Sequence, residues 1–294
     1  MRIDFAKAVA SGNDFVVVDN RGGRLSDKIS GLADLAKVVC RRRHSIGADG
    51  LLVLEDSAAC DFKMRIFNPD GSEVTMCGNG IRCSALYAQT KGWFRGPVKI
   101  ETGAGVLHAE TAGKEKGSAS GEARLSDNTA RHGICDSVKI KMTQPCDIKL
   151  DMNIGIGKTI IIVHAINTGV AHAVHFVENI NGYSVKDIGS KVRHHTSFQP
   201  DGTNVDFVET IGESRIAVRT YERGVEDETL ACGTGVVASA IISSLAQNIK
   251  QPVEALTRSG EVVKVYFKRE HNHFTDVYLE GDASIAFEGG LNYV

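Results

Sequence analysis

The chain has 294 residues, of which 42% are hydrophobic and 24% charged, so it can bury a sizeable core and is not a disordered protein. Its formal net charge of −2 argues against a broad basic surface for nucleic acid. No stretch approaches the ~20 apolar residues of a membrane span, and the start lacks the apolar core of a signal peptide. The seven cysteines are odd in number and scattered, which favours reduced thiols in the cytoplasm over a disulfide framework.

The first half of the chain is predicted to consist of strands around one helix that begins at a cysteine. Apolar runs and alternation predict strands over 2–9, 14–20, 51–54 and 62–67, and residues 30–42 have the spacing of a helix. The basic run Arg41-Arg42-Arg43-His44 is interpreted as the solvated end of that helix. A turn at 68–71 precedes Cys77 and a buried helix to about 91. Strands follow near 97–101 and 105–110, and the polar stretch 111–121 predicts an exposed hairpin loop.

The second half repeats this plan. Strands are predicted over 160–163, 174–177, 203–208 and 215–221, then a helix from Cys232 to about 247, then strands over 261–267, 274–280 and 283–287. The interval from Gly12 to Cys77 nearly equals that from Gly169 to Cys232, and Asn204 is placed in the position of Asn68. We therefore predict an α+β fold of two pseudo-symmetric domains that arose by internal duplication. Each is a mostly antiparallel β-sheet or barrel around a central helix, with the halves at 1–130 plus 281–294 and at 131–280.

The repeated segment has the form Cys-Gly-x-Gly, at Cys77-Gly78-Asn79-Gly80 and at Cys232-Gly233-Thr234-Gly235. Glycines permit a tight turn, and the N–H groups that begin the following helix can bind an anion. A cysteine at this position lies near the positive end of the helix dipole, which is expected to lower the pKa of its thiol. A single buried cysteine is usually inert, but packing alone does not require the same turn, thiol and helix start twice.

Two active thiols favour proton transfer over acyl transfer. One thiolate can remove the proton of a carbon next to a carboxylate, and the opposite thiol can return it, so that the carbon is inverted. The glycine amides at 78–80 and 233–235 would hold the carboxylate. No cofactor and no metal ion are required, and no lysine typical of a pyridoxal phosphate site stands out. Two other classes stay open: a cysteine hydrolase that uses Cys232 with His172, and a non-enzymatic protein that only binds anions.

The motifs resemble those of the diaminopimelate epimerases, and they follow that family's order over nearly the whole chain. The matching segments are Gly12-Asn13-Asp14-Phe15, residues 46–50, Phe67-Asn68-Pro69-Asp70-Gly71-Ser72-Glu73, Met76 to Cys83, Glu222-Arg223-Gly224 and Ala231 to Gly235. The resemblance implies a diaminopimelate epimerase-like fold with the site in a cleft between the domains. It also implies cofactor-independent interconversion of LL- and meso-2,6-diaminopimelate in lysine and peptidoglycan precursor synthesis, and a cytoplasmic homodimer without nucleic-acid or membrane partners.

The resemblance also implies a role for each matching residue. Cys77 and Cys232 are the acid–base pair, and Gly78, Asn79, Gly233 and Thr234 hold the reacting carboxylate. The ligands of the amino groups and the distal carboxylate are Asn13, Asn68, Asn204, Glu222 and Arg223. His172 is similar to a family histidine beside the cleft.

The chain departs from the family at a few positions that concern the distal end of the substrate. Val170 and Ala171 replace an Asn-Pro whose asparagine binds substrate, and Asn167 is the candidate to supply the lost amide. Gly50 stands where many members have a substrate-contacting glutamine. A further alternative within the same fold is a racemase that acts on proline or hydroxyproline. Such a substrate has no distal ammonium and carboxylate, and would not need Asn68, Asn204 and Arg223 together.

Overall fold

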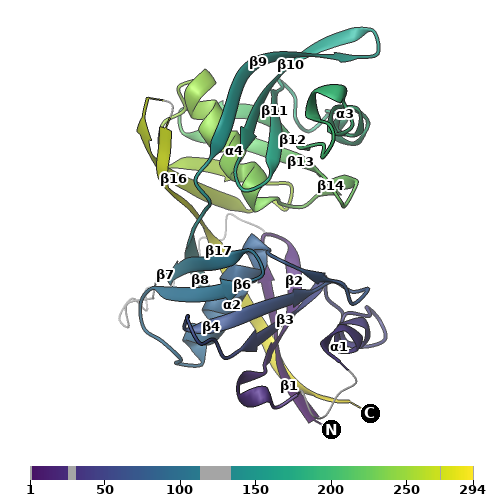
Figure 1. Cartoon of the computed structure of the whole chain (residues 1–294), viewed down its shortest axis with the longest axis vertical. Helices are drawn as coiled ribbons and strands as arrows, with labels where there is room; N and C mark the ends of the chain where they lie inside the picture. Colours follow the sequence, from purple (N-terminus) through teal and green to yellow (C-terminus); the bar gives the residue numbers. More distant parts are fainter. Residues whose placement is uncertain (1, 26–30, 113–133, 272, 294) are drawn as a thin grey trace, which may run out of the picture. The chain divides into compact units, whose positions relative to one another are not determined.

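The computed structural model describes residues 2–25, 31–112, 134–271 and 273–293, and it divides the chain into two compact units (Figure 1). The first unit comprises Met1–Ile140 and Gly281–Val294, and the second comprises Lys141–Glu280. The domain boundary expected at 130 and most of the hairpin loop expected at 111–121 lie outside the described residues. Among the residues that are described, no helix is long and apolar enough to cross a membrane.

Eight of the described strands of the first unit form a closed ring, in which each strand pairs with two neighbours. In ring order they are β1 (Arg2–Ala10), β2 (Asn13–Asp19), β3 (Gly50–Glu55), β4 (Phe62–Phe67), β6 (Val98–Thr102), β7 (Gly105–Thr111), β8 (Ile134–Lys141) and β17 (His273–Asn292). The pairs β2–β3 and β4–β6 are parallel, and β5 (Glu73–Val74) adds to β4. Closure leaves no unpaired edge in the ring, which is how barrels avoid edge-to-edge association.

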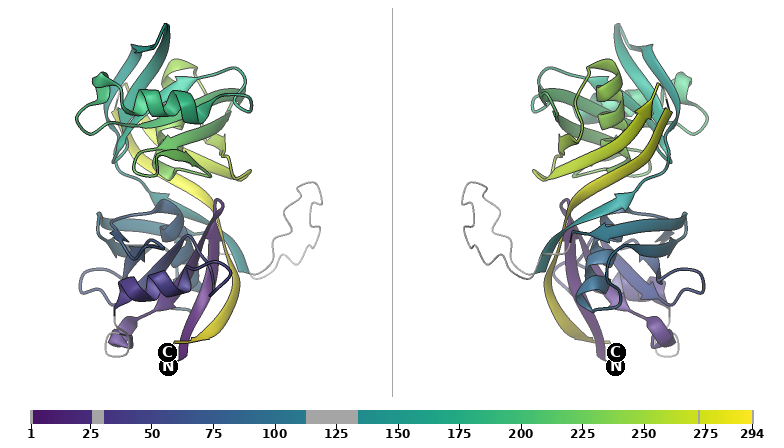
Figure 2. Two further views of the ribbon diagram at one scale, coloured as in Figure 1. Left: turned by 90° about the vertical axis from the view of Figure 1, so that its right-hand side faces the viewer. Right: turned by 90° about the vertical axis from the view of Figure 1, so that its left-hand side faces the viewer.

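The ring closes because the last strand of the chain pairs with the first. Residues 284–292 of β17 pair antiparallel with β1, so the N- and C-terminal strands run side by side, as the views in Figure 2 show. Strands over 274–280 and 283–287 were predicted separately, but the structure has one continuous strand. The prediction was wrong here because Gly281 and Asp282 continue the extended backbone and do not form a turn.

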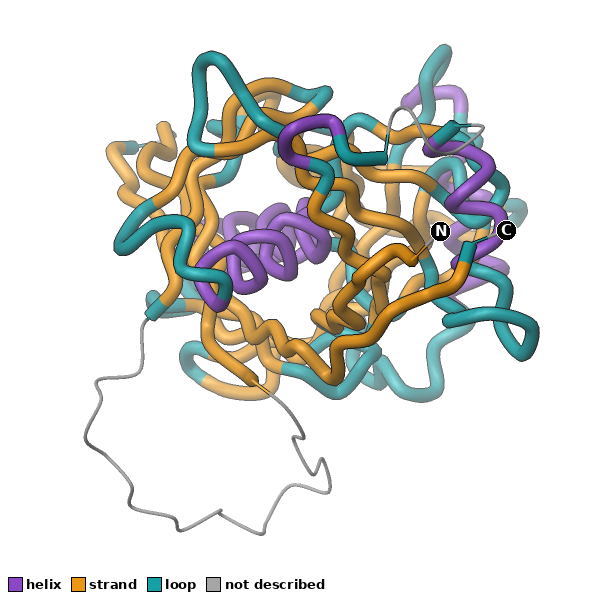
Figure 3. The backbone as a smooth tube through the Cα atoms, turned by 90° about the horizontal axis from the view of Figure 1, so that it is seen from below, coloured by secondary structure: helices purple, strands orange, loops and turns teal. Residues whose placement is uncertain are grey.

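The central helix of the first unit is α2 (Gly78–Thr90), which contacts β1, β2, β3, β4 and β7. Figure 3 shows strands surrounding a helix in the view from below. Residues 79–88 of α2 are all buried, because strands approach the helix from every side, and this explains its many small side chains. Helix α1 (Leu32–Val39) packs on the other face of β2 and β3 through Leu35, Ala36 and Val39. Strands β2 and β3 are therefore covered on both faces, as their continuous apolar runs indicate.

The second unit repeats this order of strands and the same parallel pairs. The succession is β9 (Cys146–Ile156), β10 (Thr159–Asn167), β11 (Ala171–Phe176), β12 (Asn204–Gly212), β13 (Arg215–Glu222), β15 (Val253–Leu256), β16 (Val262–Glu270) and the first part of β17. The parallel pairs are β11–β12 and β13–β15, and β14 (Asp227–Thr229) adds to β13 as β5 adds to β4. Helix α4 (Gly233–Ala246) corresponds to α2. The duplicated α+β fold predicted from the sequence is confirmed.

Helix α3 (Val185–Arg193) is the counterpart of α1, and the sequence analysis did not predict it. Its pattern was available, because Val185, Ile188 and Val192 recur at helical spacing after Ser184. Val185 and Val192 are buried against β9, β11, β12 and β13. Two short 3-10 helices complete the elements, η1 (Arg21–Gly23) and η2 (Thr196–Phe198).

Strand register corrects one equivalence between the halves. Phe15 lies opposite Gly50 in the parallel pair β2–β3, as His172 lies opposite Asn204 in β11–β12. Leu51 then pairs with Phe67, as Val205 pairs with Tyr221. Asn204 is therefore equivalent to Gly50, and Asn68 to Glu222, whereas the sequence analysis had placed Asn204 in the position of Asn68. Loops of different length had obscured the register.

Candidate active site

Cys77 is the residue that caps helix α2 in the first unit. Its backbone is extended (φ −149°, ψ 118°), the helix begins at Gly78, and the Ile81 N–H donates to the Cys77 carbonyl at 2.9 Å. The N–H groups of Gly78, Asn79 and Gly80 precede this first bond and have no partner within the helix, so they are available to an anion at this end. The predicted helix start at the Cys-Gly-x-Gly turn is confirmed.

Asn79 and Asn13 are joined in the first half-site by a chain of amide hydrogen bonds. Asn79 Nδ2 donates to Asn13 Oδ1 at 2.7 Å, and Asn13 Nδ2 donates to Asp49 Oδ2 at 3.1 Å. From the other side, buried Arg82 donates through Nη2 to Asn79 Oδ1 at 2.5 Å and to Ser11 Oγ at 2.7 Å. The structure thus brings two of the predicted substrate ligands together, and Asp49 and Arg82 fix the orientation of their amides.

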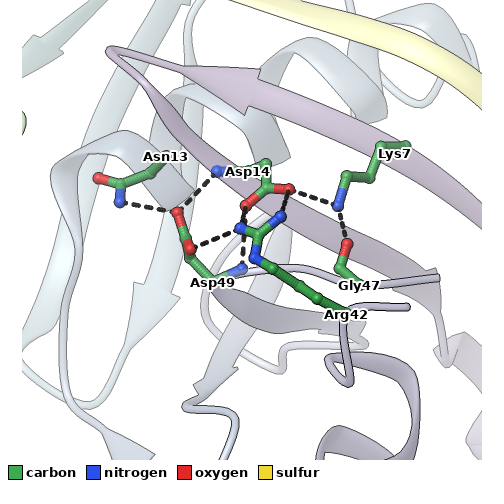
Figure 4. A network of polar contacts seen from close by, with 6 residues as sticks. All are labelled: Lys7, Asn13, Asp14, Arg42, Gly47 and Asp49. Carbon is green, nitrogen blue, oxygen red and sulfur yellow. Dashed lines mark hydrogen bonds and ion pairs between the residues drawn. The ribbon is translucent and has the colours of Figure 1, made fainter. Parts of the chain in front are cut away.

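Asp49 in turn belongs to an ion-pair network (Figure 4). Arg42 Nη2 lies 2.8 Å from Asp49 Oδ1 and 2.5 Å from Asp14 Oδ1, and Lys7 Nζ lies 2.7 Å from Asp14 Oδ2. Lys7 also donates to the Gly47 carbonyl. Burial alone would raise the pKa of Asp14, but the hydrogen bonds and charges of Arg42 and Lys7 outweigh burial and hold that pKa below its ordinary value. Arg42 is therefore part of this network, although the sequence analysis took its basic run for a solvated helix end.

We expect Asp14→Asn to lower the free energy of unfolding at pH 7 by about 1.5–3 kcal/mol, since hydrogen bonds to charged groups are lost. The carboxyl has a lower pKa in the folded than in the unfolded chain, so its contribution is complete above about pH 4 and is lost as the pH falls through the folded-state value. Urea unfolding at pH 7, 4 and 3 should therefore show that the difference in free energy of unfolding between the variant and the wild type decreases as the pH falls. Asp4→Asn is the matched control, because Asp4 pairs with Arg2 at the exposed surface. A difference in free energy of unfolding that stays constant with pH would contradict the prediction.

Asn68 follows β4 and is engaged in its own turn. Its Nδ2 donates to Ser72 Oγ at 3.0 Å, its N–H donates to the Ser72 carbonyl at 2.8 Å, and its carbonyl accepts from Gly71 N–H at 2.9 Å. Within the described part of this unit, Asn68 forms no hydrogen bond with any of the other predicted ligands. Its role as a ligand remains a prediction.

The second unit presents the equivalent thiol, Cys232, as the cap of helix α4. Its backbone is again extended (φ −118°, ψ 110°), and the Val236 N–H donates to the Cys232 carbonyl at 2.9 Å. Cys232 is 8% exposed. The two cysteines therefore occupy matching positions on the two central helices.

His172 is brought beside this thiol by a buried chain of polar groups. His172 Nδ1 lies 2.7 Å from Asp206 Oδ2, and His172 Nε2 lies 3.0 Å from Thr234 Oγ1. Thr234 Oγ1 lies 3.4 Å from Cys232 Sγ. Neither the His172 nor the Asp206 side chain is exposed to solvent. Asp206 was not among the residues predicted from the sequence, although a carboxylate inside the apolar run Val205-Asp206-Phe207-Val208 needs a buried partner and was a usable signal.

The surroundings of Cys232 overturn the expectation that the helix start lowers its pKa. Burial raises the pKa of the Cys232 thiol well above its ordinary value, and the negative charges of Glu222 and Asp206 raise it further. The hydrogen bonds that Cys232 makes with the Thr234 hydroxyl and the Gly235 N–H lower it by less. Burial also raises the pKa of Glu222. In this unit desolvation outweighs the hydrogen bonds at the helix start.

The remaining predicted ligands of the second unit lie around Asn204. Asn204 Oδ1 accepts from the Arg223 N–H at 2.7 Å, and its Nδ2 lies 3.5 Å from His172 Nε2. The Arg223 guanidinium donates to the Asp201 carbonyl at 3.2 Å. Asn167 Oδ1 accepts from Gly169 N–H at 2.9 Å and so stabilises its own loop. The structure thus groups Cys232, Gly233, Thr234, His172 and Asn204, with Glu222 and Arg223 at the adjoining end of β13.

Solved structures with this fold include a PhzF-family phenazine biosynthesis protein of Bacillus anthracis, with a TM-score of 0.67 at 16% identity over 100% of both chains. Another is a hydroxyproline epimerase of Agrobacterium vitis, with a TM-score of 0.65 at 17% identity over 99% of this chain and 91% of that one. At these identities the likeness shows the fold alone. The chain therefore belongs to the fold class of two similar halves that these structures share.

The family model described as diaminopimelate epimerase matches residues 5–126 and 164–286. The diaminopimelate epimerase of Aquifex aeolicus is 41% identical over 297 aligned positions, which cover 99% of this chain and 98% of that protein. That of Chlorobaculum tepidum is 36% identical over 96% of this chain and 98% of that protein. The chain belongs to the diaminopimelate epimerase family, and it is an isomerase.

Proposed function

We propose that the chain interconverts LL- and meso-2,6-diaminopimelate by proton transfer between the substrate α-carbon and two thiols, those of Cys77 and Cys232. The observation that carries this proposal is the capping position that each cysteine holds on a central helix, in two halves with the same order of strands. Membership of the family supports the choice of diaminopimelate, and it places the reaction in lysine and peptidoglycan precursor synthesis.

The chemistry of the substrate explains why two thiols are needed. A proton next to a carboxylate is weakly acidic, so its removal requires a desolvated base and stabilisation of the charge that develops on the carboxylate. One thiolate removes the proton and the other thiol donates a proton to the opposite face, which inverts the carbon. The helix N–H groups of Gly78, Asn79, Gly233 and Thr234 would bind the carboxylate. The reaction requires no redox step, so this chain's own groups suffice in the proposal.

The two ends of the substrate call for different ligands. We assign the amino groups and the distal carboxylate to Asn13, Asn68, Asn204, Glu222 and Arg223. The charge of Arg223 suits a carboxylate and that of Glu222 an ammonium. The orientation of Asn13 by Asp49 and of Asn204 by the Arg223 N–H supports this assignment, since preoriented amides bind with less loss of entropy.

The proposal is tested by incubating the reduced protein with LL-diaminopimelate in deuterated water and following the α-proton by NMR. We expect loss of the α-proton signal together with the appearance of the meso isomer. Proline and hydroxyproline, tested in parallel, should exchange no proton. Exchange with these substrates alone would assign the chain to the other racemases of this fold, and a covalent thioester without exchange would assign it to the hydrolases.

We further propose that the protein acts in the cytoplasm as a homodimer, with a small molecule as its substrate and without nucleic-acid or membrane partners. The reduced thiols that the reaction needs support the compartment. The net charge of −2 supports the absence of a nucleic-acid surface. Light scattering at micromolar concentration tests the dimer, and a monomeric mass would refute it.

A further inference from the structure

The Cys232 half-site contains a buried carboxylate, Asp206, whose hydrogen bonds go to Thr220 and His172 and not to the thiol. Asp206 lies on β12 beneath the first turn of α4, so close that a side chain on Gly235 would overlap its carboxylate. One carboxylate oxygen, Oδ1, accepts from Thr220 Oγ1 at 2.7 Å, and the other, Oδ2, faces His172 Nδ1 at 2.7 Å. Both oxygens are therefore used, and the glycine of the Cys-Gly-x-Gly turn leaves the space that Asp206 occupies.

The position of Asp206 determines which group donates in every bond from there to the thiol. An ionised carboxylate only accepts, so His172 Nδ1 carries the proton of the neutral imidazole and Nε2 accepts. Thr234 Oγ1, 3.0 Å away, then donates to Nε2. A hydroxyl has one proton, so the same Oγ1 accepts from the Cys232 thiol at 3.4 Å. The thiol proton is thereby directed along the chain towards His172.

We propose that Asp206 is a positioning residue that fixes the tautomer of His172 and so opens a path for the proton of Cys232 through Thr234. The inference rests on the proposed function in taking Cys232 as one of the two acid–base thiols. In the step, the S–H bond breaks and the proton joins Thr234 Oγ1, while the hydroxyl proton of Thr234 passes to His172 Nε2. The products are a thiolate, an intact hydroxyl and an imidazolium, and Asp206 remains ionised beside the imidazolium. The reverse transfer restores the thiol.

Burial makes such a partner necessary. Desolvation disfavours the thiolate of Cys232, and two further anionic groups face it, Glu222 from the end of β13 and Asp206 from β12. Among the titratable groups that the structure describes around this thiol, His172 on β11 is the one that can become a cation. Asp206 stabilises that cation through Nδ1–H, so the charge pair forms inside the unit without solvent.

The first half-site lacks this chain. By strand register Phe15 is equivalent to His172 and Leu52 to Asp206, and the turn motif makes Asn79 equivalent to Thr234. Leu52 is fully buried and Phe15 is 3% exposed, so apolar side chains take the places of Asp206 and His172 in the first unit. The two thiols therefore have different surroundings, and the proposed path belongs to Cys232 alone.

Asp206→Asn is the direct test, because it preserves the volume beside Gly235. Thr220 still requires an acceptor at Oδ1, so the amide NH₂ faces His172 Nδ1 and forces the imidazole proton onto Nε2. We expect kcat to fall on the order of 10²–10⁴-fold with little change in KM, as for other removals of an oriented proton acceptor. Thr220→Val is the matched control, because it removes the other bond of Asp206 and leaves the carboxylate. It should keep kcat within about threefold.

A second measurement follows the pH dependence of Cys232 alkylation in the absence of substrate. Trypsin releases Cys232 in the peptide 224–250 and Cys77 in the peptide 66–82, and each peptide contains one cysteine. In Asp206→Asn the pH midpoint of Cys232 alkylation should rise by about one unit or more, while that of Cys77 stays unchanged. A failure of the deuterium exchange test in the wild type would refute the proposed function, but it would leave this pH profile and its interpretation intact.

A double mutant separates positioning from packing. In a His172→Ala background Asp206→Asn should cause no further loss of kcat, because Asp206 acts only through the histidine. If Asp206→Asn does not fold, as judged by thermal unfolding, Thr234→Ser and Thr234→Val provide the same test. Thr234→Ser keeps the hydroxyl, so the pH midpoint of Cys232 alkylation should equal that of the wild type. Thr234→Val removes the hydroxyl and should raise this midpoint. The proposal is overturned if Asp206→Asn has the kcat and the Cys232 alkylation profile of the wild type. It is also overturned if Asp206→Asn lowers kcat as much in the His172→Ala background as in the wild type. Equal pH midpoints of Cys232 alkylation in Thr234→Ser and Thr234→Val would likewise overturn it.

Discussion

Cys77→Ala and Cys232→Ala should each reduce the interconversion of LL- and meso-diaminopimelate by at least about 10³-fold, because inversion needs a proton-transferring group on both faces of the carbon. Each variant retains one thiol, so slow exchange of the α-proton from one stereoisomer should survive. The two variants should retain it for opposite stereoisomers. Steady-state kinetics in both directions and NMR in deuterated water measure these rates.

Cys146→Ala is the matched control for these substitutions. Cys146 is exposed at the beginning of β9 and caps no helix, so its removal should leave all rates unchanged. Wild-type interconversion by either the Cys77 or the Cys232 variant would refute the two-thiol mechanism. Loss of exchange from both stereoisomers in one variant, with the fold intact, would instead indicate that a single cysteine serves both faces.

Arg223→Met should lower kcat/KM for diaminopimelate by roughly 30-fold to several thousand-fold. The distal carboxylate must be desolvated when it binds, and loss of its cationic partner leaves a buried charge unpaired at a cost of about 2–5 kcal/mol, where each tenfold is about 1.4 kcal/mol. In the structure the Arg223 guanidinium is held by the Asp201 carbonyl at 3.2 Å. Asn204 Oδ1 accepts from the Arg223 backbone N–H, so both the backbone and the guanidinium of Arg223 are held within the second unit.

Arg193→Met provides the control, because the Arg193 guanidinium donates to the same Asp201 carbonyl, at 3.4 Å, and pairs with Glu226. It should affect stability but not kcat/KM. Alkylation of Cys77 and Cys232 should be unchanged in the Arg223 variant, since Arg223 is assigned to binding. Near-normal kinetics in Arg223→Met would show that another group holds the distal carboxylate. The replacement of the family asparagine by Val170 would then belong to a pocket that binds the distal end of the substrate differently.

The sequence pattern was sufficient to locate the two helix starts and most strands, because a glycine turn or a run of β-branched residues determines the local backbone conformation through residues adjacent in the sequence. It did not reveal what surrounds the thiols. Asp206, Asp49 and Arg82 act through partners far away in the chain, and the pKa of Cys232 depends on burial and on charges from other strands. The equivalence of Asn68 with Glu222 likewise required the register of paired strands.

The closure of the first ring has a consequence for the order of events on the ribosome. Met1–Ile140 is made first, but β1 and β8 of its ring both pair with β17, which follows the other strands of the second unit in the chain. At about 5–20 residues per second this delay is on the order of ten seconds, during which two strand edges stay open to misassociation. The unit Lys141–Glu280 is contiguous and does not depend on Gly281–Val294. A released chain that ends at residue 280 should therefore have a protease-resistant second half and a protease-sensitive first half.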